Sequence, residues 1–186
     1  MTKPILVVTV GLPGMGKTTR ARELEAELGA VRFTVDAWLK PLFGEANPKE
    51  ARDTMEGRLI AAARRLLELG QTVILDFGFW SRDERGALHD LAARAGAHFR
   101  IEYLDLDRET QWQRIEVRQQ SSEALETAFT ISREMLDSYV DMFDPPTAEE
   151  LAASEPPPPP PEAGEWRHWR AARWPTSEAG NGQTRV

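Results

Sequence analysis

Cysteine is absent from the 186-residue sequence, which excludes disulfide bonds, thiolate metal sites and cysteine catalysis. Long apolar runs are absent too, because the first run, Ile5–Val10, is too short for a signal-peptide core or a membrane span. The three histidines, His89, His98 and His168, lie too far apart in the sequence to suggest a metal site. These absences lead us to expect a cytoplasmic protein without a membrane span.

Basic residues are also in deficit. The formal net charge is −7, because 30 Asp and Glu residues outnumber 23 Lys and Arg residues. Residues 151–186 hold four Arg and four Glu, so the whole acidic excess lies in residues 1–150. A groove for long nucleic acid requires the opposite balance of charge, so the composition argues against binding of such a polymer.

A phosphate-binding motif follows the first apolar run. Ile5–Val10 is continuous and β-branched, as in a strand buried on both faces, and Thr18–Leu28 has the composition of a helix. Between them stands a Gly-x-x-x-x-Gly-Lys-Thr pattern, the P-loop, which predicts ATP binding. Its glycines let backbone N–H groups converge on phosphate oxygens at the positive end of the helix. The predicted nucleotide-binding residues are Gly11, Leu12, Pro13, Gly14, Met15, Gly16, Lys17, Thr18 and Thr19.

The last residues of this loop have separate expected roles. Lys17 can reach the β- and γ-phosphates of ATP, and the Thr18 hydroxyl is the expected ligand of Mg²⁺. Thr19 adds a further polar contact. ATP and Mg²⁺ are therefore the predicted cofactors.

The chain alternates between strand and helix patterns as far as residue 143. This alternation predicts an α/β fold, with a parallel sheet covered by helices on both faces. The sheet is expected to have four strands, or five if Trp166–Arg170 adds one. The polar segment Gln119–Thr127 has the composition of a mobile lid. The expected strands are residues 5–10, 31–35, 73–75 and 99–106, and the expected helices are residues 18–28, 47–69, 81–95, 107–118 and 132–143.

Composition changes abruptly near residue 154. We predict a core domain at residues 1–154, a proline-rich linker at residues 155–165 and a tail at residues 166–186. Six consecutive prolines in the linker favour an extended polyproline segment. The tryptophans and arginines of the tail either fold back over an exposed sheet edge or dock a protein partner or an anionic surface. We expect its last dozen residues to be disordered.

Several P-loop classes are excluded because their motifs are missing. The sequence has no Asn-Lys-x-Asp of GTPases, no Ser-Gly-Gly of ABC ATPases, and no Asp-Glu pair after its third strand. Instead, the loop together with Phe33–Asp36, Asp76–Arg85 and Arg114-x-x-x-Arg118 resembles the small P-loop kinase-like ATP-binding proteins. These are related to polynucleotide 5′-kinases, zeta-toxin kinases and chloramphenicol phosphotransferase. The resemblance covers about residues 4–150 and implies a three-layer fold like that of nucleoside-monophosphate kinases, with a small lid.

Two aspartates that follow strands are candidates for the site. Asp36 should reach the crevice at the carboxyl end of the sheet, and the resemblance implies that it accepts the proton of an acceptor hydroxyl. Its alternative role is to cap a helix at residues 37–40. Asp76 should bind Mg²⁺ through water or hold the acceptor, unless it only satisfies the amides of a turn.

Four arginines complete the predicted site. Arg82 and Arg85 are one helical turn from each other and are predicted, with Asp36 and Asp76, to contact the substrate. Arg114 and Arg118 lie on one helix face beside the lid, where they would neutralise charge during phosphoryl transfer. Their alternative is an ordinary ion pair with Glu109 or Glu116. The predicted catalytic residues are Asp36, Lys17, Arg114 and Arg118.

These observations predict an ATP-dependent phosphotransferase that moves the γ-phosphoryl group to a hydroxyl of a small molecule. One alternative is a polynucleotide 5′-hydroxyl kinase. Another is a nucleotide-responsive binding protein without significant turnover, whose tail docks a partner. The sequence does not identify the acceptor, because the shape of the pocket decides it.

Overall fold

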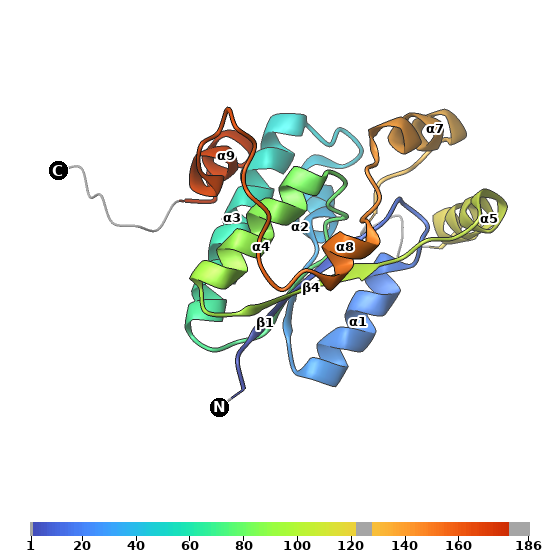
Figure 1. Cartoon of the computed structure of the whole chain (residues 1–186). Helices are drawn as coiled ribbons and strands as arrows, with labels where there is room; N and C mark the ends of the chain where they lie inside the picture. Colours follow the sequence, from blue (N-terminus) through green and yellow to red (C-terminus); the bar gives the residue numbers. More distant parts are fainter. Residues whose placement is uncertain (1, 122–127, 179–186) are drawn as a thin grey trace.

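The computed structural model describes residues 2–121 and 128–178 (Figure 1). At its centre lies a sheet of four parallel strands in the order β2-β3-β1-β4. The central strand β1 is apolar and pairs on both sides, with Val7 opposite Ile74 and Arg100. The predicted α/β fold with a parallel sheet is confirmed. The strands are β1 (Ile5–Val10), β2 (Val31–Phe33), β3 (Val73–Leu75) and β4 (His98–Tyr103).

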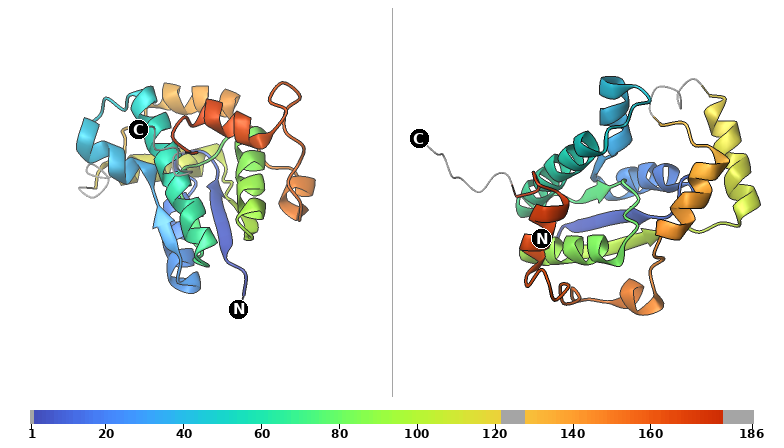
Figure 2. Two further views of the ribbon diagram at one scale, coloured as in Figure 1. Left: turned by 90° about the vertical axis from the view of Figure 1, so that its left-hand side faces the viewer. Right: turned by 90° about the horizontal axis from the view of Figure 1, so that it is seen from above.

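Helices cover both faces of this sheet and produce three layers (Figure 2). On one face, Val8 of β1 belongs to a buried cluster with Leu88 of α4 and with residues of α3. On the other face, Val7 belongs to a cluster with Leu24 of α1. The alternating faces of β1 thus separate the two helical layers. The helices are α1 (Lys17–Leu28), α2 (Val35–Phe43), α3 (Lys49–Glu68), α4 (Arg82–Arg94), α5 (Arg108–Gln119), α7 (Arg133–Met142), α8 (Ala148–Ala152) and α9 (Trp166–Arg173).

Local capping signals locate two helix starts correctly. The Ser81 hydroxyl accepts a hydrogen bond from the Glu84 amide at 3.1 Å, and the Glu84 carboxylate accepts one from the Ser81 amide at 3.2 Å. This is a complete capping box. The Asp107 carboxylate accepts a hydrogen bond from the Thr110 amide at 3.0 Å and caps α5. The capping box also fixes the end of the loop between β3 and α4.

The start of α2 differs from our expectation. The second strand ends at Phe33, and α2 begins at Val35 with Thr34 in the N-cap position. Asp36 lies inside the first turn of α2, so its alternative role as a helix cap is wrong. An acidic residue in that turn still interacts favourably with the helix dipole.

The fifth strand expected at Trp166–Arg170 is wrong, because this segment forms the helix α9. Trp166 and Arg170 are four residues apart and both are buried, which is the spacing of one helix face. Figures 1 and 2 show α9 beside α3 and α4, and Trp174 behind it joins the main buried cluster. The C-terminal segment therefore folds back onto the helical layer of α3 and α4 rather than onto a sheet edge.

Two glycines in the middle of helices make room for this segment. A Cβ atom at Gly86 of α4 would lie 2.7 Å from the Trp166 ring and 3.0 Å from Pro157. A Cβ atom at Gly57 of α3 would lie 2.4 Å from the Thr176 hydroxyl. Glycine inside a helix costs about 1 kcal/mol relative to alanine. These close approaches give each glycine a structural reason.

The folded part of the C-terminal segment extends further along the sequence than we expected. Thr176 donates a hydrogen bond from its hydroxyl to the Thr54 carbonyl at 2.6 Å, and Ser177 is buried. Residues 175–178 thus form turns against α3, whereas we expected disorder from about residue 175. Residues 179–186 lie outside the described residues. Most of the predicted lid, Gln119–Thr127, also lies outside them.

Candidate functional site

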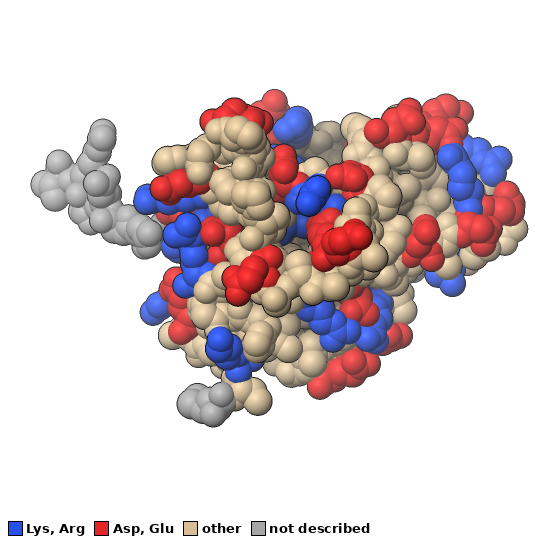
Figure 3. Space-filling model, viewed as in Figure 1, with Lys and Arg blue, Asp and Glu red and all other residues tan. Residues whose placement is uncertain are grey.

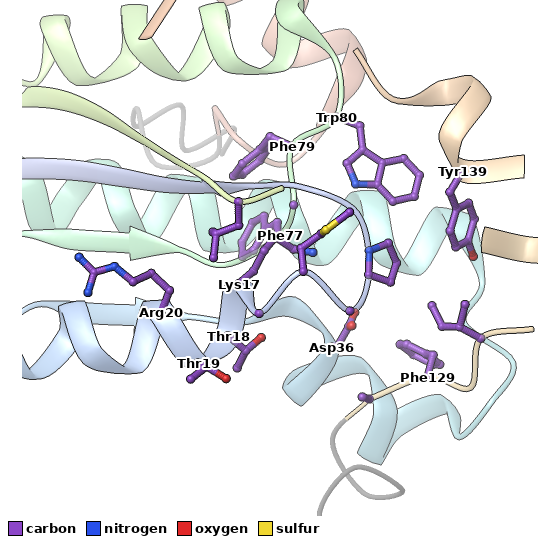
Figure 4. A pocket seen from close by; sticks show the side chains of 18 of the residues that line it. Lys17, Thr18, Thr19, Arg20, Asp36, Phe77, Phe79, Trp80, Phe129 and Tyr139 are labelled. Atoms are coloured by element: carbon purple, nitrogen blue, oxygen red, sulfur yellow. The ribbon is translucent and has the colours of Figure 1, made fainter. Parts of the chain in front are cut away.

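A cavity of about 1170 Å³ opens at the carboxyl ends of the strands. The segments that follow β1, β2, β3 and β4 all contribute to its lining, as is usual for ligand sites in open α/β sheets. Figure 4 shows Lys17, Asp36, Trp80, Phe129 and Tyr139 around this cavity. Residues from widely separated stretches of the sequence therefore meet at one place.

The P-loop forms one end of the cavity, and its glycines are required by their surroundings. Gly11, Gly14 and Gly16 have φ angles of 143°, 83° and 92°, which favour glycine. A Cβ atom at Gly11 would lie 2.5 Å from the Leu104 carbonyl oxygen, and one at Gly14 would lie 2.7 Å from Ile115. The loop is thus held closely against the segment that leads into α5 and against α5 itself.

Lys17 lies at the inner side of this loop. Its ammonium donates a hydrogen bond to the Leu12 carbonyl at 2.9 Å. Burial lowers the pKa of Lys17 from 10.5 to about 8, while the nearby carboxylates of Asp76 and Asp36 oppose this shift. Thr18 and Thr19 also line the cavity, so every predicted nucleotide-binding residue from Pro13 onward lies on its wall.

Asp36 projects into the same cavity and is paired with a residue that we did not predict. The Arg52 guanidinium of α3 donates a hydrogen bond from Nη2 to Asp36 Oδ1 at 2.6 Å. A second bond from Arg52 Nε reaches Asn47 at 3.1 Å, and the guanidinium lies 5.5 Å from the centre of the Phe129 ring. In the sequence, Arg52 is only one of several charged residues on a helix, so no local signal identified it.

Arg114 and Arg118 of α5 both line the cavity, as predicted. Arg114 lies above the P-loop, because a Cβ atom at Gly16 would be 3.4 Å from its Nη1 atom. Burial lowers the pKa of Arg118, and the charge of Asp36 opposes that shift. Its Nε atom is buried and has no hydrogen-bond partner among the described residues. Neither arginine forms a salt bridge within the described residues, so both remain available to an anion.

Asp76 is held just behind the cavity wall. Its side chain is 5% exposed and accepts hydrogen bonds from the hydroxyls of Thr9 at 3.0 Å and Thr34 at 3.2 Å. It does not line the cavity directly, but its charge acts on Lys17. Within the described residues there is no group of three or more His, Cys, Asp and Glu that could hold a metal alone. The Thr18 hydroxyl and the Asp76 carboxylate are the hard oxygen groups that fit Mg²⁺ coordinated mainly by phosphate and water.

The two arginines predicted to contact substrate from α4 lie elsewhere. Arg82 is exposed and is not part of the lining. Arg85 is 1% exposed, and its guanidinium donates hydrogen bonds to both carboxylate oxygens of Glu150 at 2.6 and 2.9 Å. It also donates to the Asp144 carbonyl at 2.9 Å. Arg85 therefore links α4 to the segment that contains α8. Neither Arg82 nor Arg85 belongs to the cavity, so the prediction that they contact the substrate is not supported.

We expect ATP affinity to fall as the pH rises through about 8. Because Lys17 has a lowered pKa of about 8, its ammonium is mostly lost above that pH, and a phosphate needs the charged form. Titration calorimetry should give an affinity roughly tenfold lower at about pH 9 than at about pH 7. A Lys17→Met variant should bind weakly at both values. Equal wild-type affinity at the two pH values would contradict this role of Lys17.

Comparison with known proteins identifies relatives of this fold. Residues 6–146 match the AAA domain family. No curated protein matches the sequence. The structure is similar to Kti12 of Chaetomium thermophilum in complex with ADP-AlF3, with 25% identity over 76% of this chain and 81% of that chain (TM-score 0.60).

Two further structures are similar in fold alone. A chain of the Pnkp1/Rnl/Hen1 RNA repair complex has 22% identity over 76% of this chain, but this corresponds to only 44% of that chain (TM-score 0.62). A gluconokinase from Sinorhizobium meliloti 1021 has 17% identity over 81% of each chain (TM-score 0.55).

None of the helices in residues 2–121 and 128–178 has both the length and the apolar character needed to cross a membrane.

Proposed function

Since this chain belongs to the AAA domain family, a P-loop kinase-like family whose fold binds nucleotides, we propose that it is an ATP-dependent phosphotransferase. The γ-phosphoryl group is transferred to a hydroxyl of a small molecule. The observation that carries this proposal is one cavity that is lined both by the P-loop and by the Asp36 carboxylate.

The size of the cavity suits two ligands. Pockets for one drug-sized molecule usually measure about 300–1000 Å³. The volume of about 1170 Å³ leaves room for an acceptor beside the triphosphate of ATP. A site that only bound nucleotide would not need the additional aromatic space around Trp80, Tyr139 and Phe129.

The phosphate end combines several positive groups. Lys17, Arg114 and Arg118 line it, and the N-terminus of α1 adds its dipole. The arginines neutralise charge that moves toward the β-phosphate as the bond to the γ-phosphorus breaks. Mg²⁺, held by Thr18 and through water by Asp76, would supply further neutralisation of the β- and γ-phosphates when bound.

The acceptor end contains the base. Asp36 Oδ1 is occupied by Arg52 at 2.6 Å, while no hydrogen bond to Oδ2 is found within the described residues. Oδ2 can therefore accept the proton of the acceptor hydroxyl. The hydroxyl oxygen forms a bond to the γ-phosphorus, the bond from that phosphorus to the bridging oxygen breaks, and ADP leaves. Arg52 keeps the carboxylate turned toward the cavity throughout.

A small acceptor is favoured over a polymer by the acidic balance of the chain, which has 30 Asp and Glu residues against 23 Lys and Arg residues. On the face shown in Figure 3, basic and acidic side chains are interspersed, without a continuous basic stripe. The aromatic rings of Trp80 and Tyr139, with centres 4.9 Å apart, offer an apolar wall of limited extent. Such a wall suits the body of a compact molecule.

The test is a screen with ATP labelled on the γ-phosphate against sugars, nucleosides, antibiotics, other hydroxyl compounds and 5′-hydroxyl oligonucleotides. We expect a labelled small-molecule product that depends on Mg²⁺. Labelled oligonucleotide, with affinity that falls steeply with salt, would instead establish the polynucleotide kinase. Tight ATP binding without product from any acceptor would favour the nucleotide-responsive binding protein.

A further inference from the structure

The C-terminal segment reaches the cavity although it lies beyond residues 6–146, which match the family. Arg173, the last residue of α9, is among the residues that line the cavity. Trp174 follows it and is fully buried. Residues 166–178, which we name the C-terminal clasp, thus contribute to the site as well as to the core.

Arg173 joins two helices across the edge of the cavity. Its guanidinium lies 2.7 Å from Asp53 and 3.5 Å from Glu56 of α3, and 2.8 Å from Glu84 of α4. Glu56 also accepts a hydrogen bond from Trp174 Nε1 at 2.9 Å. Three carboxylates from two helices are therefore gathered around one guanidinium of the clasp. Asp53 and Glu56 have further basic partners in Lys49 and Arg52. Within the described residues Glu84 pairs with Arg173 alone, so loss of Arg173 would leave its charge unneutralised beside the other carboxylates.

The pairing with Glu84 acts directly on the acceptor wall. One carboxylate oxygen, Oε1, accepts a hydrogen bond from Arg173 Nε at 2.9 Å. The other, Oε2, accepts hydrogen bonds from the amides of Trp80 at 3.1 Å and Ser81 at 3.2 Å. Trp80 in turn packs against Tyr139 in the cavity. A continuous chain of contacts thus connects the clasp to the ring that an acceptor would meet.

The helices are shaped to receive the clasp. Gly57 and Gly86 stand at the two places where side chains of this segment and of the proline tract approach the helix backbones. Trp166 Nε1 also donates a hydrogen bond to the Pro157 carbonyl at 2.8 Å. The proline tract, residues 156–161, therefore packs against α9 and helps to hold it in place. Because polyproline is stiff, it also limits the conformations that the clasp can take.

We propose that the C-terminal clasp completes the acceptor side of the cavity and that Arg173 is a positioning residue that fixes Trp80 through Glu84. The part of this inference that concerns the acceptor rests on the proposed function. The part that concerns the position of Trp80 depends only on the contacts described above. Specificity for the acceptor is then partly encoded outside the region that this chain shares with its family.

The test compares Arg173→Ala and Arg173→Lys with the matched control Arg167→Ala. Arg167 belongs to the same helix, is largely exposed and lies 3.9 Å from Glu178, away from the cavity. Amide hydrogen exchange of the full chain is followed at residues 77–84, with β1 as the internal reference. In Arg173→Ala we expect the Trp80 and Ser81 amides to exchange at least about tenfold faster, while β1 stays unchanged. In Arg173→Lys the Trp80 and Ser81 amides should be partly protected from exchange. Lysine keeps the positive charge but lacks the planar guanidinium that can pair with several carboxylates.

A second variant keeps the test decisive if Arg173→Ala is poorly folded. Glu84→Gln retains an oxygen that can accept the capping bonds but loses the charge that Arg173 pairs with. It should share the faster exchange at Trp80. In a double variant, Arg173→Ala should add little to it. Unchanged exchange at Trp80 and Ser81 in folded Arg173 and Glu84 variants would overturn the proposal.

Kinetics connect the clasp to acceptor binding. With the acceptor found in the labelled-ATP screen, Arg173→Ala should raise the acceptor KM by about tenfold, and ATP affinity should stay within about threefold. A loss confined to ATP affinity would overturn the positioning role. If the screen finds no acceptor, the proposed function fails, while the exchange experiment still decides whether Arg173 fixes Trp80.

Discussion

Replacing Asp36 with asparagine is expected to lower phosphoryl transfer by about two to four decades, the range for loss of a general base. Asparagine has nearly the same shape but cannot take the proton of the acceptor hydroxyl. Because the P-loop, Lys17 and the α5 arginines are untouched, ATP affinity should stay within a few-fold. The paired measurements are single-turnover transfer rates and ATP calorimetry on the same folded protein.

The control for this experiment is Asp137→Asn, the same chemical change on α7. Asp137 pairs with the exposed Arg108 and does not line the cavity, so transfer should remain normal. Arg52→Lys adds a second comparison, since it retains a positive charge beside Asp36 but loses the planar guanidinium that lies over the Phe129 ring. Normal turnover of Asp36→Asn would reduce Asp36 to a partner of Arg52 in the structure.

Deleting residues 156–186 is expected to lower the melting temperature by about 12–24 °C or to prevent folding. Trp166 and Trp174 are 4% and 0% exposed, and loss of each buried tryptophan costs about 3 kcal/mol or more. For a chain of this length, 1 kcal/mol corresponds to about 2–4 °C. The deletion also leaves the buried Glu56 carboxylate without the hydrogen bond from Trp174.

The matched control for the deletion ends the chain after Glu178. This shorter deletion keeps every contact of the C-terminal clasp described above and should melt like the full chain. Thermal melts of the three proteins also test the boundary at residue 154, which stays a prediction. A deletion of residues 156–186 that melts within a few degrees of the full chain would support an independent core and a dispensable tail.

Local chemistry made much of the fold predictable. Some sequence signals depend only on residues a few positions apart. They are the loop at residues 11–18, the capping box at Ser81 and the cap at Asp107, and the helices that follow them begin where the sequence indicates. The apolar, β-branched run of β1 likewise indicates a central strand, because a strand buried on both faces has a nearly continuous apolar sequence. Strand order, by contrast, came from the structure.

Long-range pairing decided what the arginines do, and the sequence does not indicate these partners. Arg85 and Arg114 look alike as surface residues on helices, yet Arg85 pairs with Glu150, 65 positions away, while Arg114 faces the cavity. Arg52 became a site residue because the fold brings α3 beside Asp36 of α2. Arg173 became one because α9 lies where its guanidinium reaches both α3 and α4. The sequence by itself determined the nucleotide cradle, since its backbone geometry is encoded by adjacent glycines. Only the tertiary structure determined the wall that we propose for the acceptor, because its charges and rings come from distant segments brought together by packing.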